Sequence, residues 1–414
     1  MEIAIIAIGT RGDVQPCVAL AKELQKEGID VFVASHTEYK KLVVENNIKY
    51  YELPGNPATA WDKNPNKENT EKEKVNFSQQ LENYSKGWLK IALEICKNSD
   101  AIVYTSLFFV GNHLAEKLNV PYFPIIFEPN LSTSAFPSAY FKSDKNFGGS
   151  FNKFTHKFAY QSFWLNTRKS VNRIRREVLD LSPSPFWGYF GKMQKEENPV
   201  FCSFSKHLIP KPIDWNKNIN ISGYWFLNKK NKYEPPKELV DFFSDGTLPI
   251  YFDFGSFSHD RMKRKVKIIL EDLIKSNERL LIDPGKMDIS DVKFSTEMQI
   301  IDNSVPHDWL LPKVKTIITH GGVGAVHAAM RAGVPTLPIT IFPAQYFWGK
   351  ITYKLGLGAR PLTIKKLIPG QVLDSISYIN NNHELKSNLI KIKNDLENEN
   401  GPKTASDFII NYLE

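Results

Sequence analysis

The sequence predicts an α/β fold made of two tandem Rossmann-like domains that face a central cleft. Short apolar runs alternate with segments of helical spacing through the first half of the chain, and the same alternation resumes after residue 236. Such alternation is typical of βαβ units and of parallel sheets. The chain has 414 residues; at roughly 150 residues per domain, this length suggests two or three domains.

The first domain is expected over residues 1–222. Its strands are predicted from short apolar runs at residues 3–8, 30–34, 49–53, 101–105, 122–127, 201–204 and 219–222. Its helices are predicted from 3.6-residue spacing at residues 14–27, 81–96 and 112–118, before a long helix rich in aromatic and basic residues. The polar stretch at residues 64–76 has no periodicity and is predicted to be a mobile loop.

The second domain is expected over residues 237–400, after a linker at residues 223–236 that holds clustered lysines and a Pro-Pro pair. Its strands are predicted at residues 250–254, 280–282, 298–301, 316–319 and 336–341. A last helix is predicted at about residues 404–413. Parallel sheets bind ligands outside the carboxyl ends of their strands. Two such sheets therefore offer two half-sites, which suits a reaction with two substrates.

Composition excludes several classes of protein. With 42% apolar and 24% charged residues, the chain is typical of a globular protein. No apolar run approaches the roughly 20 residues that span a membrane. Residues 3–8 have no basic flank or cleavage site, so a signal peptide is not expected. Three widely spaced cysteines, Cys17, Cys96 and Cys202, favour a reducing, cytoplasmic setting and argue against a Cys-built metal site.

The excess of positive charge is confined to one stretch. The net charge is +8, and residues 141–217 alone hold 14 basic and 6 acidic residues. No nucleic-acid-binding motif accompanies them, so nucleic acid is not an expected partner. Aromatic residues such as Phe158 lie between the basic ones. This pattern fits either an ordinary helix with one buried and one solvated face, or a helix in peripheral contact with an anionic membrane.

The first candidate site is the segment GTRGDVQP at residues 9–16, where the first strand runs into the first helix. Gly9 and Gly12 let a ligand approach the backbone. Their G-x-x-G spacing lacks the third glycine of the dinucleotide-binding fingerprint. Asp13 is placed either to cap the helix or to accept a proton as a general base.

The second candidate site is the segment HGGVGA at residues 320–325, which follows an expected strand and opens a helix. His320, Gly321, Gly322 and Gly324 would present a side-chain donor and backbone amides to an anion such as a diphosphate, which the helix dipole also favours. A tight packing turn is the alternative. The segment is not a P-loop, because Gly-Lys-Ser/Thr is missing. Ser256 lies in a smaller turn of similar kind, FGS at residues 254–256.

Four segments occur in one order within about 45 residues: VPHDWL at 305–310, HGGVG at 320–324, RAGVP at 331–335 and QYFWG at 345–349. Together they resemble the donor-binding signature of the family 1 glycosyltransferases. The pattern is closest to the sterol glucosyltransferases and the bacterial natural-product glycosyltransferases. The segments at residues 9–16, 223–226 and 254–256 resemble the same branch, and the resemblance is faint at residues 60–200.

The resemblance implies the two-domain GT-B fold, with the acceptor bound by residues 1–222 and a nucleotide sugar by residues 237–400. It also implies that residues 401–414 form a helix that crosses back to the first domain. The implied activity is that of an inverting, metal-independent UDP-glycosyltransferase that moves a hexose to a hydroxyl of a lipophilic sterol, terpenoid or polyketide. No cofactor is implied beyond the nucleotide sugar, with UDP the expected nucleotide.

Roles carry over by resemblance only where the motifs match. Asp13 stands at the position of the acceptor-activating base. The donor would contact Gly12, Ser256, Val305, His307, His320, Gly321, Gly322, Gly324 and Gln345. Two positions depart from the family pattern. Ala344 replaces an acidic residue that accepts hydrogen bonds from sugar hydroxyls, and Ala325 replaces a hydroxyl residue. The sugar is therefore open between a hexose, a deoxysugar and an N-acetylated sugar.

Aromatic residues dominate the expected acceptor side, since a planar apolar acceptor suits an aromatic cleft. The candidate acceptor-binding residues are Phe108, Phe127, Phe136 and Phe158, with core packing as the alternative for each. Two other functions are compatible with the sequence. One is a non-catalytic homologue that binds a nucleotide sugar or a lipid, and the other is a nucleotide-sugar epimerase or hydrolase on the same fold.

Overall fold

The computed structural model describes residues 1–55, 77–141, 147–188, 198–228, 233–244, 246–253, 263–285, 297–302 and 305–414. The chain divides into two compact units. Unit 1 comprises residues 1–206, 210–227 and 400–414, and unit 2 comprises residues 207–209 and 228–399. The loop expected at residues 64–76 and the turn expected at residues 254–256 lie outside the described residues.

Unit 1 is built on a seven-stranded sheet in the order β3-β2-β1-β4-β5-β6-β7, in which every neighbouring pair is parallel. The strands are β1 Glu2–Ile6, β2 Asp30–Ser35, β3 Lys49–Glu52, β4 Ala101–Thr105, β5 Tyr122–Ile126, β6 Val200–Cys202 and β7 Ile219–Ile221. Each forms where a short apolar run predicts it. Such runs suit strands that are buried on both faces.

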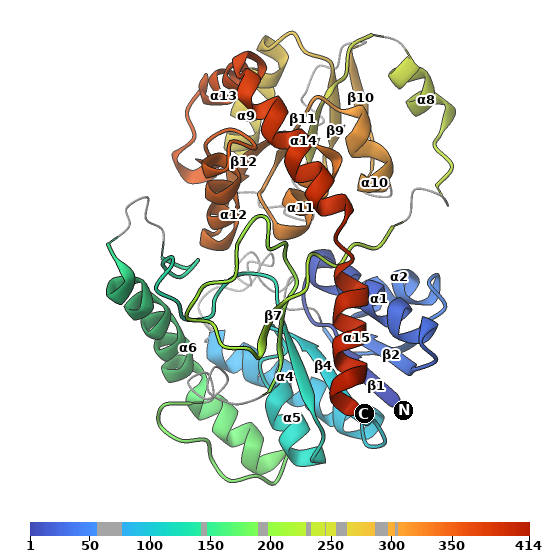
Figure 1. The fold of residues 1–414 in the computed structure, drawn as a ribbon, viewed down its shortest axis with the longest axis vertical. Coiled ribbons are helices and arrows are strands. Elements are labelled where there is room, and N and C mark those ends of the chain that lie inside the picture. Colours follow the sequence, from blue (N-terminus) through green and yellow to red (C-terminus); the bar gives the residue numbers. More distant parts are fainter. Residues whose placement is uncertain are drawn as a thin grey trace, which may run out of the picture. The chain divides into compact units, whose positions relative to one another are not determined.

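Helices cover both faces of this sheet (Figure 1). They are α1 Arg11–Lys26, α2 Lys40–Val44, α4 Phe77–Ile95, α5 Gly111–Leu118, α6 Gly149–Glu177 and α15 Gly401–Leu413. On one face, Ile6 belongs to a core cluster with Trp88 of α4 and Leu114 of α5. On the other, α15 packs beside α1, and its Tyr412 ring meets the edge of Phe123 on β5. The last helix of the chain therefore belongs to unit 1.

Unit 2 holds a six-stranded parallel sheet in the order β10-β9-β8-β11-β12-β13. The strands are β8 Ile250–Asp253, β9 Leu280–Asp283, β10 Met298–Ile300, β11 Thr316–Thr319, β12 Thr336–Thr340 and β13 Leu362–Thr363. The helices are α8 Lys237–Ser244, α9 Lys263–Lys275, α10 His307–Leu310, α11 Val323–Ala332, α12 Pro343–Lys354, α13 Gln371–Asn381 and α14 His383–Glu397. The predicted α/β fold with two parallel sheets is confirmed.

Strand order singles out one place in each sheet. In unit 1 the strands β1 to β3 are added toward one edge of the sheet, and β4 to β7 toward the other. In unit 2 the strands β8 to β10 are added toward one edge, and β11 to β13 toward the other. The order therefore reverses between β1 and β4, and between β8 and β11. Open α/β sheets bind ligands outside the carboxyl ends of the strands at such a switch point. The GTRGDVQP segment follows β1, and the HGGVGA segment follows β11. Both candidate segments thus lie at the switch point of their own sheet.

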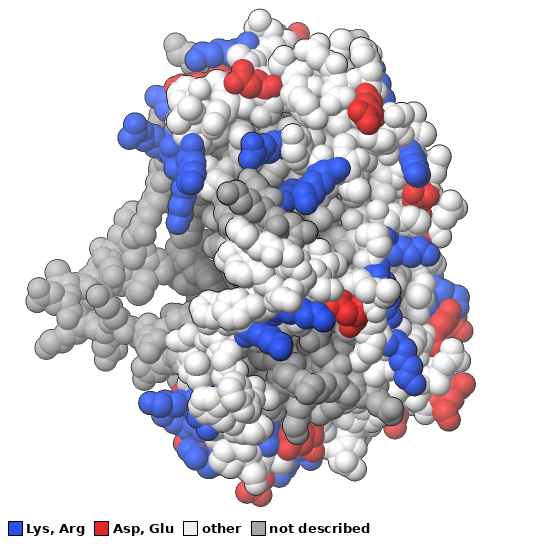
Figure 2. All heavy atoms as spheres, turned by 60° about the vertical axis from the view of Figure 1, so that its left-hand side comes forward, with Lys and Arg blue, Asp and Glu red and all other residues white. Residues whose placement is uncertain are grey.

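Three further properties of the described residues bear on the function. Among the described residues on the face drawn in Figure 2, Lys and Arg side chains are dispersed and form no continuous basic stripe. Within the described ranges, no helix combines the length and the apolar character needed to cross a membrane. Cys17, Cys96 and Cys202 are buried and unbridged.

Candidate functional site

Asp13 belongs to the first turn of α1 rather than to its cap. The helix begins at Arg11, three residues before the start expected from apolar spacing, and Thr10 is its N-cap. One oxygen of Asp13, Oδ2, accepts hydrogen bonds from the Thr10 backbone amide at 2.7 Å and from the Thr10 hydroxyl at 2.9 Å. This reciprocal capping box fixes the carboxylate at the carboxyl end of β1. Thr10 rather than Asp13 is therefore the N-cap residue, and the Asp13 side chain takes part in capping from the N3 position.

Gly9 makes room for that carboxylate. Its φ angle of +140° lies in the region that favours glycine, and a Cβ atom at this position would meet Asp13 Oδ2 at 2.3 Å. Gly12 is under no such restriction, because a Cβ there would meet only the Thr10 hydroxyl at an ordinary 3.5 Å. The absence of a side chain at Gly9 thus leaves the space that the Asp13 carboxylate occupies.

We expect Gly9→Ala to displace the Asp13 side chain and to lower any activity that depends on it. The added methyl overlaps a carboxylate oxygen, and the backbone conformation disfavours a side chain by roughly 1 kcal/mol. Gly28→Ala is the matched control, because Gly28 also has a positive φ angle, +78°, and a Cβ there would meet nothing within 4 Å. Activity of purified variants checks this. Equal activity of Gly9→Ala and Gly28→Ala would contradict the proposed role of Gly9.

A second carboxylate lies near Asp13. Glu128 lies two residues after the end of β5, and β5 is separated from β1 only by β4. Burial raises the pKa of Asp13 to about 6. Burial and, next, repulsion from Asp13 raise the pKa of Glu128 to about 7. Two carboxyl groups at this edge of the sheet therefore change protonation near neutral pH, which is the range in which a general base works best.

Glu128 is a residue that sequence reasoning missed. Its segment, FEPN at residues 127–130, has no motif character. The signal that would have found it is positional: a carboxylate placed just after a strand that neighbours the switch point of a parallel sheet. Finding it requires the strand order, which the sequence does not state directly.

In unit 2 the loop after β11 is glycine-rich and leads straight into α11. Gly321 has a φ angle of +84°, and Gly322 is the N-cap. The helix begins at Val323, so Gly324 lies in its first turn. First-turn amides have no partner within their helix and are suited to bind an anion. The Gly321 amide already points to the Thr319 hydroxyl, at 3.5 Å.

The glycine loop packs tightly on its surroundings. A Cβ at Gly321 would lie 3.0 Å from the backbone oxygen of Gln345, and one at Gly322 would lie 2.5 Å from Nε2 of His320. Burial lowers the pKa of His320, so the ring is neutral at pH 7 and has one N–H to donate. The structure therefore brings together four predicted residues at the carboxyl end of β11 and the amino end of α12: His320, Gly321, Gly322 and Gln345.

Acidic residues line the same edge of the sheet. Asp253 ends β8, and the strand register sets it between Thr319 of β11 and Asp283 of β9. Nε2 of His307 lies 3.6 Å from Oδ2 of Asp253. Burial is the main cause that raises the pKa of Asp283 to about 6. Sequence reasoning missed both aspartates, whose oxygens can accept hydrogen bonds from hydroxyl groups such as those of a ribose.

The remaining residues predicted to contact the donor are Val305, Gln345 and Ser256, and the structure describes the first two. Val305 is buried just before α10, two residues from His307. Gln345 is buried, and its side-chain oxygen accepts hydrogen bonds from the amides of Ile341 at 2.8 Å and Phe342 at 3.0 Å. That oxygen therefore caps α12, and the side-chain NH₂ group is a hydrogen-bond donor. Ser256 lies outside the described residues.

The structure does not bring the four acceptor-side phenylalanines into one pocket. Phe108 is fully enclosed in the core, against Trp88. Phe127 is buried beside Glu128, at the carboxyl end of β5. Phe136 is half-buried against His156. Phe158 lies on the outer face of α6 with 64% of its surface exposed. Phe127 and Phe136 remain candidates for acceptor contact.

Comparison with known proteins places the chain in a family. Residues 192–398 match the family described as "UDP-glucoronosyl and UDP-glucosyl transferase", and residues 3–137 match the N-terminal domain of glycosyltransferase family 28. The first match spans half of the 414 residues. The chain belongs to the UDP-glucoronosyl and UDP-glucosyl transferase family. The family resemblance inferred from the motifs is confirmed.

Similar members of this UDP-glycosyltransferase family are named as sterol enzymes. The whole chain aligns with the sterol 3-beta-glucosyltransferase of Saccharomyces cerevisiae at 31% identity, and covers 35% of that protein. It aligns over its whole length with sterol 3-beta-glucosyltransferase UGT80A2 of Arabidopsis thaliana at 30% identity, and covers 66% of it. The chain thus spans about a third of the length of the fungal relatives that it matches.

Solved structures confirm the GT-B fold. The kitacinnamycin glycosyltransferase superposes on the whole chain with a TM-score of 0.73 at 15% identity, with 99% of that protein covered. The calicheamicin glycosyltransferase CalG4 gives a TM-score of 0.69 at 15% identity, with 98% of it covered. At such low identity, the likeness concerns the fold alone.

Proposed function

We propose that this chain is an inverting glycosyltransferase. It would move a hexose from a UDP-glucose-like donor to a hydroxyl group of a lipophilic acceptor, with the sterol class as the first candidate. The observation that carries the proposal is the Asp13 carboxylate, fixed by a capping box at the switch point of unit 1 with a pKa of about 6. The relatives named as sterol 3-beta-glucosyltransferases support the acceptor class.

The base role follows from the state of Asp13. A carboxylate with a pKa near 6 is largely ionised at pH 7 and can still accept a proton. In the proposed reaction, Asp13 takes the proton of the acceptor hydroxyl while the acceptor oxygen attacks C1 of the sugar. The bond from C1 to the diphosphate breaks in the same displacement, so the configuration at C1 inverts.

Unit 2 would hold the donor. Amides in the first turn of α11 and the neutral ring of His320 donate hydrogen bonds to the diphosphate, and the helix dipole stabilises the charge that develops as it leaves. Asp253 and Asp283 supply acceptors for ribose hydroxyls at the neighbouring strand ends. The nucleotide sugar is a co-substrate, and the proposal includes no metal or other cofactor.

The acceptor side would lie in unit 1, at the carboxyl ends of β1, β4 and β5. Buried Phe127 offers apolar contact there, half-buried Phe136 belongs to the segment that follows β5, and Glu128 is a carboxylate that interacts electrostatically with Asp13. An apolar acceptor with a single reactive hydroxyl suits such a lining. Sterols, terpenoids and polyketides share these properties.

The pH dependence of transfer follows from the pKa of Asp13. Only the ionised carboxylate accepts a proton, so we expect kcat/KM to rise with pH through about 6 and to level off above it. Below that value the rate should fall roughly tenfold for each pH unit. Initial rates at saturating donor, with folding checked at each pH, measure this. A flat profile between pH 5 and 7 would exclude a carboxylate base of this pKa.

A transfer assay tests the function itself. Incubation of the chain with UDP-glucose and a panel of lipophilic alcohols should release UDP only when a suitable acceptor is present. A thermal-shift screen of nucleotide sugars tests donor binding separately, because a ligand of the native state raises the apparent stability. Binding without UDP release for any acceptor would favour a non-catalytic nucleotide-sugar-binding protein. UDP release without an acceptor would favour a hydrolase.

A further inference from the structure

The amino-terminal half of α6 has an inverted distribution of polarity. Its inward-facing residues are polar: Asn152, Thr155 and His156 are at most 4% exposed. Its outward-facing residues include large apolar ones: Phe154 is 57% exposed and Phe158 is 64% exposed, each next to an exposed lysine, Lys153 or Lys157. A surface helix in water normally shows the opposite arrangement. The outer face of α6 therefore requires an explanation other than core packing.

The inward polar residues are satisfied within unit 1. The Asn152 side-chain amide donates to the backbone oxygen of Ser134 at 2.8 Å, and the Thr155 hydroxyl accepts from the Ser138 amide at 2.9 Å. The ring of His156 contacts the backbone oxygens of Asn130 and Phe136, each at 3.1 Å. These bonds fix the rotation of α6. Its apolar side is therefore held outward rather than exposed by chance.

The outward apolar residues form one continuous ladder. Ring centroids are 4.9 Å apart between Phe147 and Phe151, 6.1 Å between Phe151 and Phe154, and 6.0 Å between Phe154 and Phe158. Positions 151, 154, 158 and 165 fall within a sector of about 60° on a helix of 3.6 residues per turn. Leu165 is 52% exposed and extends the row. We call Phe151, Phe154, Phe158 and Leu165 the α6 aromatic face.

The same side of the helix becomes basic further along. Lys169 and Arg176 follow on the helical sector that holds the α6 aromatic face, Arg173 lies about 40° beside that sector, and all three are exposed. Arg173 also pairs with Glu82 of α4 at 2.9 Å. The segment 141–217 carries 14 basic and 6 acidic residues, which is the entire net charge of the chain. An apolar row that continues into a basic row complements a surface that is apolar inside and anionic at its border.

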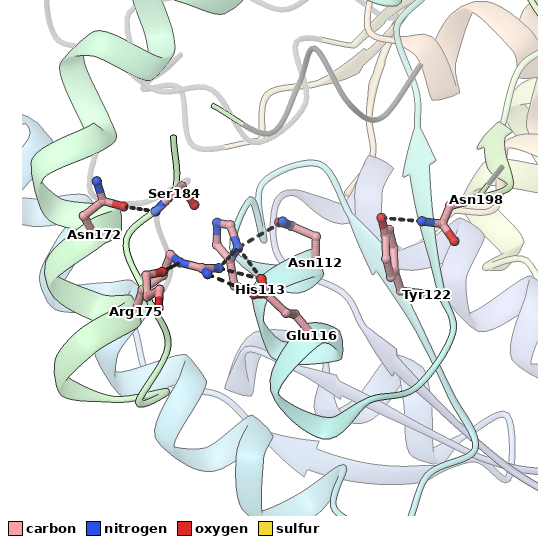
Figure 3. Close-up of polar contacts among 9 residues, drawn as sticks. Asn112, His113, Glu116, Tyr122, Asn172, Arg175, Ser184 and Asn198 are labelled. Atoms are coloured by element: carbon pink, nitrogen blue, oxygen red, sulfur yellow. Dashed lines mark hydrogen bonds and ion pairs between the residues drawn. The ribbon is translucent and has the colours of Figure 1, made fainter. Parts of the chain in front are cut away.

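A buried network holds α6 in place (Figure 3). The Arg175 guanidinium donates to Glu116 of α5 at 2.6 and 2.9 Å and contacts Nδ1 of His113 at 2.8 Å. Hydrogen bonds from Arg175 are the main cause that lowers the pKa of Glu116 to about 2. Arg175 is only 5% exposed. Removing the partner of a buried guanidinium is costly, so the carboxyl-terminal half of α6 is firmly attached to α5.

We propose that the outer side of α6 docks on an anionic lipid bilayer, with the α6 aromatic face in the interfacial region and Lys169, Arg173 and Arg176 against the phosphate headgroups. Aromatic and leucine side chains bind strongly at the boundary between headgroups and acyl chains, and basic side chains add electrostatic attraction to anionic lipids. Trp187, 72% exposed, lies close to this helix, since the neighbouring Phe186 backbone oxygen accepts from Trp164 of α6 at 2.7 Å. Tryptophan is enriched at this boundary.

Vesicle flotation tests the proposal without any transfer reaction, so its outcome is independent of the proposed activity. The chain is floated with phosphatidylcholine vesicles, with and without phosphatidylserine, at low and high salt. We expect binding to the phosphatidylserine vesicles at low salt and its loss at high salt. We expect Phe154→Ser/Leu165→Ser to weaken that binding by roughly tenfold or more. Lys169→Glu/Arg176→Glu should abolish the preference for phosphatidylserine.

Ile390→Ser is the matched control, because this side chain on α14 is 62% exposed and lies in unit 2. It should bind vesicles as the wild type does. Unchanged melting temperatures would show that the variants fold. Failure of the wild type to float, or unchanged binding by Phe154→Ser/Leu165→Ser, would overturn the proposal. A wild-type dimer that this double variant converts to monomers would instead assign the face to a second copy of the chain.

Discussion

Asp13→Asn is expected to reduce glycosyl transfer by roughly 10²- to 10⁴-fold, the contribution of a positioned general base. The amide cannot take the proton of the acceptor hydroxyl. Its oxygen can still accept the two hydrogen bonds that Thr10 gives to Asp13 Oδ2, so the start of α1 is preserved. The affinity for UDP should not change, because the proposed donor site lies in unit 2. Initial rates and UDP titrations of the purified variant measure both effects.

The thermal stability of Asp13→Asn shows whether the variant has lost only the base or also its fold. Burial raises the pKa of Asp13 from 3.8 to about 6, so the folded state favours the protonated carboxyl. Protonation of Asp13 therefore stabilises the folded state relative to the unfolded state. This contribution is complete below about pH 4 and is lost as the pH rises through about 6. The uncharged Asn avoids this loss, and the variant should melt no lower than the wild type at pH 8.

Asp180→Asn is the matched control for charge removal, since this side chain is 99% exposed. It should transfer as the wild type does. Retained transfer in Asp13→Asn would show that another group is the base. Glu128 would then be the first residue to examine, because its pKa is raised to about 7 and it interacts electrostatically with Asp13.

Gly322→Ala is expected to weaken nucleotide binding by roughly tenfold or more. The added methyl would lie 2.5 Å from Nε2 of His320, so the ring must rotate away from the glycine loop. A hydrogen bond to a charged phosphate contributes about 1.5–3 kcal/mol, and each 1.4 kcal/mol changes the affinity tenfold. Gly322 has a φ angle of −65°, which any residue adopts. The substitution therefore adds no backbone strain. Calorimetric titration with UDP measures the effect.

A double-mutant cycle shows whether the effect passes through His320. In a His320→Ala background the ring is absent, and Gly322→Ala should cause little further loss, so the two effects are not additive. Additive losses would mean that the methyl blocks the loop itself. Unchanged UDP affinity in Gly322→Ala would contradict the proposed diphosphate role of His320 and of this turn.

Strands were predictable because buried parallel strands are short and uniformly apolar. Residues 101–105 and 316–319 were predicted as strands and form β4 and β11 with the same limits. β13, only Leu362–Thr363, is too short to give an apolar run. The start of α1 was predicted three residues late, because the helix begins with Arg11, Gly12 and Asp13. Its first turn depends on the Thr10–Asp13 capping box rather than on apolar spacing.

The candidate sites were predictable where they are local in sequence. The segments at residues 9–16 and 320–325 each combine a strand end, glycines and a helix start, and the structure sets both at switch points. Glu128, Asp253 and Asp283 were missed because their importance depends on strand order and register. The orientation of α6 also depends on tertiary hydrogen bonds, since its spacing alone left two alternatives open.

The stereochemistry of the product tests the central proposal most directly. The purified chain is incubated with UDP-α-glucose and a 3-hydroxysterol, and the anomeric configuration of the glycoside is read from its ¹H NMR coupling constant. A single displacement assisted by Asp13 predicts the β-glycoside, formed by the wild type roughly 10²- to 10⁴-fold faster than by Asp13→Asn. An α-glycoside, or a β-glycoside formed equally well by both proteins, would contradict the account.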